Sequence, residues 1–224
     1  MSEKGERDTN EDSYIAEKVG DFFVCAIADG VGGHIWGDLA SRMAIGELRE
    51  AVGKKAMKGL FEGFVNSNET LFFENKRKNW DMATTMVASL IQGNYNCFIG
   101  NVGDSRAYII SDGIWRTKDQ SVVENLHDAG IISEAESFSH PKRNVITQGL
   151  GLDKKVKVDV YKKNVADSVL LLCSDGLSDY VTDNAIAEIV RKYNAREACQ
   201  KLIKKALQNG SRDNITVIIA RFDK

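Results

Sequence analysis

The chain has 224 residues, of which 43% are hydrophobic and 28% are charged, and its formal net charge is −2. With 30 basic against 32 acidic residues it lacks the basic excess typical of nucleic-acid-binding proteins. Its apolar runs are far shorter than the ~20 residues that a membrane-spanning helix needs. There is one proline, Pro141, and no Pro/Gly/Ser-rich linker divides the chain. We therefore expect one domain over residues 1–224, with neither nucleic acid nor a membrane as its partner.

The four cysteines indicate a reducing environment. Cys25, Cys97 and Cys173 lie inside apolar, strand-like runs, and Cys199 lies in a helical pattern. None belongs to a Cys-x-x-Cys pair, which argues against a zinc site of that type. The first residues contain no apolar stretch of the secretory kind. We expect buried, reduced thiols and a cytoplasmic protein.

The periodicity of apolar residues predicts strands and helices in separate groups. In chain order, strands are expected at 13–17 and 22–28, helices at 37–52 and 60–78, and strands at 84–92, 95–102, 105–110 and 114–117. A polar helical insertion at 122–139 is followed by strands at 144–150, 157–161 and 168–173, helices at 183–192 and 195–208, and a strand at 214–222.

Strands in runs and helices in pairs are not the alternating pattern of a parallel sheet. The fold class expected is α+β, in which two antiparallel sheets pack face to face with helix pairs outside. Gly93-Asn94 and Asp112-Gly113 each stand between two strand-like runs, as hairpin turns do. Within the insertion, Ser133 and Glu136 have the spacing of a helix capping box.

Two other Asp-Gly pairs do not fit the hairpin pattern. Asp29-Gly30 and Asp175-Gly176 each follow a buried strand-like run, but a helical pattern comes next instead of a second strand. Asp213, in Arg-Asp-Asn, stands just before the last strand. If these three carboxylates converge, they form a site for a hard cation.

Oxygen ligands alone favour Mg²⁺ or Mn²⁺ over zinc or copper. Two such ions bridged by one carboxylate can activate a water for hydrolysis of a phosphate ester. Arg7 is a candidate bidentate donor for the phosphate.

Five segments together resemble a known family. They are Arg7-x-x-Asn10-Glu11-Asp12, Ala28-Asp29-Gly30-Val31-Gly32-Gly33-His34-x-x-Gly37, Gly100-Asn101-Val102-Gly103-Asp104-Ser105-Arg106, Ser174-Asp175-Gly176-Leu177 and Ser211-Arg212-Asp213-Asn214-Ile215-Thr216. Their order resembles that of the metal-dependent protein Ser/Thr phosphatases, the PPM or protein phosphatase 2C type. The segment from Gly130 to Asn144 is similar to the flap of bacterial members, here about residues 121–145.

The resemblance implies an α–β–β–α sandwich with a two-ion centre at one end of the sheets. Asp29 would bridge both ions, and Asp175 and Asp213 would complete the first. The Gly30 carbonyl would help to hold the second ion. Asp12, together with Glu11, would act through water.

The resemblance also implies a phosphate ligand and a third ion. Arg7 would bind the phosphate. Asp119, in Lys-Asp-Gln-Ser, would pair with Asp175 on a weaker third ion, although Gln120 replaces the histidine that follows in relatives. Asp104 is expected to serve only as a structural turn, since Gly-Asp-Ser is ordinary turn chemistry.

One position departs from the family pattern. Animal relatives have a histidine two residues after the bridging aspartate, proposed as the acid for the leaving group, where this chain has Val31. His34 is a candidate for that role, because a histidine can donate a proton near neutral pH. A structural role for His34, with protonation by water instead, stays open.

The activity implied is hydrolysis of phosphoserine and phosphothreonine in proteins, including a cognate Ser/Thr kinase and its substrates, by a monomer. Two alternatives stay open. The chain could be a catalytically impaired regulatory module of the same fold, or a phosphatase for small phosphate esters.

Overall fold

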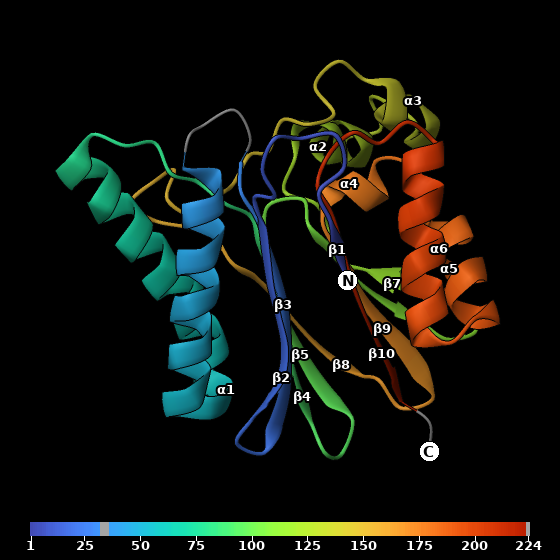
Figure 1. Ribbon diagram of the computed structural model, residues 1–224, viewed down its shortest axis with the longest axis horizontal. Coiled ribbons are helices and arrows are strands. Elements are labelled where there is room, and N and C mark those ends of the chain that lie inside the picture. Colours follow the sequence, from blue (N-terminus) through green and yellow to red (C-terminus); the bar gives the residue numbers. More distant parts are fainter. Residues whose placement is uncertain (32–35, 223–224) are drawn as a thin grey trace.

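Two five-stranded antiparallel sheets pack face to face between layers of helices (Figure 1). The computed structural model describes residues 1–31 and 36–222, apart from the side chains of Ala56 and Glu134. One sheet has the order β2 (Asp12–Val19), β3 (Phe22–Asp29), β4 (Met86–Gln92), β5 (Asn96–Val102) and β8 (Asp159–Asn164). The other has the order β1 (Ser2–Glu3), β10 (Ile215–Phe222), β9 (Ser168–Cys173), β6 (Arg106–Ile110) and β7 (Ile114–Arg116). The predicted α+β sandwich is confirmed.

Alternation along the central strands decides what each sheet face contacts. In β3, Cys25 and Ile27 belong to the core between the two sheets, whereas Val24 and Ala26 belong to the core beneath α1 (Gly37–Lys78). Both faces are therefore buried, which explains why the sequence of this strand is apolar without interruption. From the opposite sheet, Leu170 and Leu172 of β9 reach the same inter-sheet core.

The helical residues of α1 fold back on themselves into two antiparallel arms (Figure 1). Ser67 donates a hydrogen bond to the carbonyl of Ala44 at 3.1 Å, although these residues would lie ~35 Å apart in a straight helix. The two arms correspond to the predicted helices 37–52 and 60–78. On the other side, α5 (Asp183–Lys192) and α6 (Ala195–Gln208) cover the second sheet, as predicted.

The insertion consists of two short helices, α2 (Val122–Asp128) and α3 (Glu134–Ser139). The capping box at Ser133 and Glu136 is confirmed. Both helices lie at the end of the sandwich where β3 runs into its following loop (Figure 1). The hairpins at Gly93-Asn94 and Asp112-Gly113 are also confirmed, since they join β4 to β5 and β6 to β7.

Some predicted elements were wrong or incomplete. The strand expected at 144–150 is absent from this described stretch, where Ile146 and Leu150 form only isolated bridges to Ser121 and Thr84. The strand expected at 157–161 is present as β8, which begins at Asp159 and pairs with β5 at the edge of its sheet. The short elements β1 and α4 (Asp175–Ser178) had no sequence signal long enough to predict them.

Candidate metal centre

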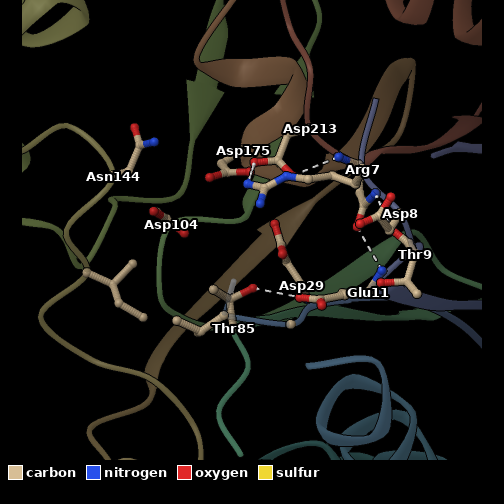
Figure 2. Close-up of a pocket in the computed structure, with 14 residues that line it drawn as sticks. Arg7, Asp8, Thr9, Glu11, Asp29, Thr85, Asp104, Asn144, Asp175 and Asp213 are labelled. Carbon is tan, nitrogen blue, oxygen red and sulfur yellow. Dashed lines mark hydrogen bonds and ion pairs between the residues drawn. The ribbon is translucent and has the colours of Figure 1, made fainter. Parts of the chain in front are cut away.

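A cavity of about 610 Å³ opens at the end of the sandwich where β3 ends, and several carboxylates line it (Figure 2). Loops from both sheets contribute: Asp29 ends β3, Asp175 begins α4 after β9, and Asp213 precedes β10. The residues lining the cavity are Arg7, Asp8, Thr9, Glu11, Asp29, Gly30, Val31, Thr85, Asp104, Asn144, Ile146, Asp175, Asp213 and Asn214. The three aspartates singled out from the sequence therefore face one space.

The register of the β2–β3 pair places a fourth carboxylate, that of Asp12, next to Asp29. In the β2–β3 pair Asp12 stands directly opposite Asp29. Its Oδ2 accepts a hydrogen bond from Ser174 at 2.8 Å, while its buried Oδ1 has no hydrogen-bond partner among the described residues. Burial, more than any neighbour, raises the pKa of Asp12 to about 7. A buried carboxylate oxygen normally has a hydrogen-bond partner. Water bound to a metal ion could supply that partner here.

The electrostatics of the cluster favour a bound cation. Burial raises the pKa of Asp29 well above its ordinary value, and the Asp12 carboxylate raises it further. The pKa of Asp175 rises to about 6, mainly through burial and then through the charge of Asp213. Buried like charges disfavour one another's ionised forms, and a divalent ion would reverse that penalty.

Arg7 is the basic side chain in the described cavity lining, and it is paired with Asp213. Its Nε and Nη2 donate to the two Asp213 oxygens at 2.9 and 2.7 Å (Figure 2). Within the part of the chain described, no three His, Cys, Asp or Glu side chains converge tightly enough to hold an ion as they stand.

Two close approaches hold the carboxylate-bearing loops together. A Cβ on Gly176 would collide with the carbonyl of Asn214, so the residues after Asp175 and Asp213 pack in direct contact. The Asn214 side chain accepts from the Glu11 amide at 2.7 Å and donates to the Lys4 carbonyl at 2.8 Å. Asn214 thereby ties the Arg7 segment to the Asp213 loop.

Hydroxyl groups fix the Asp29 main chain. Thr84 Oγ1 and the Thr85 amide both donate to the Asp29 carbonyl at 2.8 Å. Thr85 Oγ1 accepts from the Asp29 amide at 3.3 Å and shares a 2.7 Å hydrogen bond with Ser105 Oγ. These threonines were not recognised from the sequence, because their partners lie far away along the chain.

Glu11 and Gly30 both line the cavity, as expected for the places given to them. The Gly30 amide donates to the Glu11 carbonyl at 3.2 Å. A Cβ on Gly37 would collide with the Glu11 carboxylate, which therefore lies at the start of α1. Val31 also lines the cavity, whereas His34 falls outside the described residues.

Asp104 lies in the cavity and Asp119 does not, the reverse of what the sequence indicated for the third-ion position. Burial, and after it the Asp175 charge, raise the pKa of Asp104 well above its ordinary value. Both Asp119 oxygens instead accept from Arg106, at 2.8 and 2.6 Å. The sequence could have indicated Asp104 as a ligand candidate, because it stands just beyond the end of a buried strand, as the other candidates do.

Comparison with known proteins settles the family. The protein phosphatase 2C family model matches residues 2–126 and 157–215. The chain belongs to the protein phosphatase 2C family. Members are metal-dependent protein Ser/Thr phosphatases, and the chain is accordingly a hydrolase that removes phosphate from phosphoproteins.

Individual relatives agree with the family assignment. The serine/threonine phosphatase stp of Listeria monocytogenes is 35% identical over 216 residues, which cover 89% of this chain and 84% of that protein. The serine/threonine protein phosphatase PstP of Mycobacterium tuberculosis is 34% identical over 222 residues, covering 96% of this chain and 42% of PstP.

Solved phosphatase 2C structures share the fold. The crystal structure of Stp1 from Staphylococcus aureus matches with a TM-score of 0.94 at 34% identity, over 100% of this chain and 94% of that one. The catalytic domain of PstP in complex with two manganese ions matches with a TM-score of 0.85 at 31% identity, over 98% and 94%. No helix of this phosphatase, over the residues described, is long and apolar enough to cross a membrane.

Proposed function

We propose that this phosphatase binds two Mn²⁺ or Mg²⁺ ions in the cavity and hydrolyses phosphoserine and phosphothreonine by in-line attack of water. One observation carries the proposal: buried carboxylates with raised pKa values, Asp12, Asp29 and Asp175, lie in or next to one cavity. The guanidinium of Arg7, paired with Asp213, lines the same cavity. Two ions would lower the pKa of a water between them and offset charge on the phosphoryl oxygens.

We propose the following roles for the carboxylates and the Gly30 carbonyl. Asp29, at the centre of the cluster, would bridge the ions, with Asp175 and Asp213 on one and the Gly30 carbonyl on the other. Asp12 does not line the cavity and Glu11 does, and both would orient ligands through intervening water. The site selects oxygen ligation but does not distinguish Mn²⁺ from Mg²⁺.

Arg7 would bind the phosphate. Its guanidinium presents two parallel N–H donors, the geometry that suits a phosphate as well as the carboxylate it now contacts. Release of Asp213 to an ion would free the guanidinium for substrate. The leaving seryl or threonyl oxygen needs a proton, and His34 is the candidate donor.

A third, weaker ion would lie between Asp175 and Asp104. The strongest neighbouring charge on Asp104 is that of Asp175. Asp119 is better explained as the partner of Arg106.

The test is metal-dependent hydrolysis of a phosphothreonine peptide. Activity should be abolished by EDTA, restored by Mn²⁺ and lost in Asp29→Asn. Asp112→Asn, which changes an exposed hairpin aspartate in the same way, should retain activity. Hydrolysis that persists after chelation would contradict the two-ion mechanism.

The two alternative functions make different predictions. A catalytically impaired module should lack metal-binding carboxylates, whereas Asp12, Asp29, Asp175 and Asp213 are all in place here, and failure to bind Mn²⁺ in calorimetry would revive that hypothesis. A small-ester phosphatase should turn over sugar phosphates faster than phosphopeptides.

The setting we propose is a cytoplasmic signalling pathway. The chain would act as a monomeric single domain, residues 1–224, on the targets of a Ser/Thr kinase and on the kinase itself. The four buried free cysteines support a reducing compartment. The flap, about residues 121–145, would form part of the substrate-contact surface.

A further inference from the structure

Two tryptophan rings stack on each other at the two ends of α1. The ring centroids of Trp36 and Trp80 lie 4.1 Å apart, with an angle of 23° between the ring planes. The Lys78 ammonium lies 4.0 Å from the centroid of the Trp80 ring. Both rings are partly buried and pack against the core beneath α1. Trp36 directly precedes the first arm of α1 and Trp80 follows the second arm, so the stack joins the beginning of this helical segment to its end.

The first residue of α1 packs directly against two groups of the candidate metal centre. A Cβ on Gly30 would lie only 2.5 Å from the Gly37 carbonyl oxygen, and a Cβ on Gly37 would collide with the Glu11 carboxylate. Gly37 therefore contacts both the Gly30 main chain and the Glu11 side chain, with no room to spare on either side. Because the contacts are this close, a shift of the start of α1 would move one or both of these groups.

The start of α1 is not held by a capping side chain among the described residues. Trp36 is the N-cap residue and makes no side-chain hydrogen bond to the amides of the first turn. Asp38, in that turn, is paired with Arg42 at 3.0 Å. Helices commonly begin at a Ser, Thr, Asp or Asn whose side chain accepts a hydrogen bond from these amides. The stack on Trp80 supplies the side-chain anchor that a cap would otherwise provide.

The Trp80 ring is attached to a turn that is itself fixed by hydrogen bonds. The Trp80 amide donates to the Asn75 carbonyl at 3.0 Å, and the Asn75 side chain exchanges two hydrogen bonds with the Met82 main chain, at 2.7 and 2.8 Å. One residue further on, the Ala83 carbonyl accepts from the Val31 amide at 3.0 Å. The short segment from Trp80 to Ala83 therefore contacts the chain both just beyond the end of β3 and at the start of α1.

We propose that Trp80, through its stack on Trp36, is a positioning residue for the second ion of the metal centre. This role rests on the proposed function, in which the Gly30 carbonyl holds that ion and Glu11 orients ligands through water. Trp80 does not line the cavity, so it would act through the start of α1 without touching ion or substrate. Stacked rings have a preferred separation and offset, and the pair therefore fixes its two segments more closely than aliphatic side chains would.

The test is calorimetric titration of the full chain with Mn²⁺. Trp80→Leu keeps an apolar side chain but removes the stack, and we expect it to weaken one of the two ions by about 10-fold and to leave the other unchanged. Trp80→Phe, which retains a stacked ring, should recover most of the wild-type affinity. Trp36→Leu should cause the same loss, and the double variant should lose no more than either single variant, because both changes break one contact.

Trp115 provides a matched control. Its ring packs edge-on against Tyr161 with centroids 5.1 Å apart, the Lys163 ammonium lies 4.2 Å from its centroid, and it does not line the cavity. Trp115→Leu should lower the Tm of the metal-free protein and keep both wild-type Mn²⁺ affinities. In Trp80→Leu, turnover of a phosphothreonine peptide should return to the wild-type level when the Mn²⁺ concentration is raised, since the ion site is weakened rather than lost.

The outcomes distinguish the positioning role from the proposed function. Equal Mn²⁺ affinities in Trp80→Leu and the wild type, or an equal loss at both ions, would overturn the positioning role alone. A loss in Trp115→Leu as large as that in Trp80→Leu would also overturn it, because general destabilisation would then explain both. If Trp80→Leu does not fold, Trp36→Leu carries the same comparison. Failure of the wild-type protein to bind two ions would overturn the proposed function and the positioning role with it.

Discussion

Replacing Thr85 with valine removes a hydroxyl that joins two carboxylate-bearing loops while keeping the shape of the side chain. Thr85 Oγ1 contacts the Asp29 amide on one loop and Ser105, next to Asp104, on the other. Thr85 is 3% exposed and Ser105 is fully buried, so water cannot replace the lost partner without rearrangement. We expect Thr85→Val to lower both stability and metal affinity.

The size of each effect follows from the contacts. A buried group left unsatisfied costs about 1–3 kcal/mol, and the 3.3 Å contact to the Asp29 amide belongs near the lower end. The free energy of unfolding should fall by about 2–4 kcal/mol, which for a chain of this length corresponds to about 5–12 °C in Tm. Loss of an outer-shell partner weakens metal binding by about 10- to 100-fold, and we expect the lower figure because two donors still hold the Asp29 carbonyl.

The assay is calorimetric titration with Mn²⁺, together with thermal unfolding of the metal-free protein. Thr117→Val is the matched control, since the buried Thr117 hydroxyl accepts a backbone amide from Ala107 at 3.0 Å and does not line the cavity. Thr117→Val should lower the stability without lowering the affinity for Mn²⁺. Thr85→Ser, which keeps the hydroxyl, should have the stability and the Mn²⁺ affinity of the wild type. If Thr85→Val destabilises the protein but binds Mn²⁺ as the wild type does, the hydroxyl pair does not position the site.

Three further predictions concern the charged groups. Arg7→Ala should raise KM for a phosphopeptide by about 10- to 100-fold without weakening Mn²⁺ binding, because Arg7 competes with the ion for Asp213; weaker binding would mean that Arg7 supports the ion site. The pKa of Asp12 is raised to about 7, so its contribution to metal-free stability is present below the unfolded value near 4 and is lost as the pH rises through 7. The Tm of metal-free protein should therefore fall between pH 5 and pH 8, with Mn²⁺ restoring more at pH 8, and a flat metal-free profile would contradict this. His34→Ala should lower kcat and remove the alkaline fall in the rate that deprotonation of a general acid causes, whereas an unchanged profile and kcat would exclude His34 from the mechanism.

The fold was predictable because its central strands are buried on both faces. The apolar runs of β3 and β9 cannot be solvent-facing, and the four-residue spacing in α6 marks one buried helix face. The prediction failed at 144–150, where apolar residues also occur. There Ile146 and Leu150 are placed one at a time by bridges to Ser121 and Thr84, and a local pattern cannot tell such anchoring from strand pairing.

The candidate site shows the same division. Local context separated Asp29 and Asp175 from the hairpin at Asp112, since a strand follows only the last of them. Local context could not separate Asp104 from Asp119. Asp104, in Gly-Asp-Ser, and Asp119, in Lys-Asp-Gln-Ser, both stand in short polar stretches beyond a strand, and only the tertiary structure pairs Asp119 with Arg106.

The sequence by itself thus determined that aspartates able to bind a divalent ion stand at the ends of several strands. This was possible because a buried strand is visible as an apolar run in a short stretch of sequence. The tertiary structure decided which of them meet. The β2–β3 register sets Asp12 opposite Asp29, and the contact of Gly176 with Asn214 joins the Asp175 loop to the Asp213 loop. These contacts connect residues far apart in sequence, so their geometry depends on strand order and side-chain packing, which no short stretch of sequence contains.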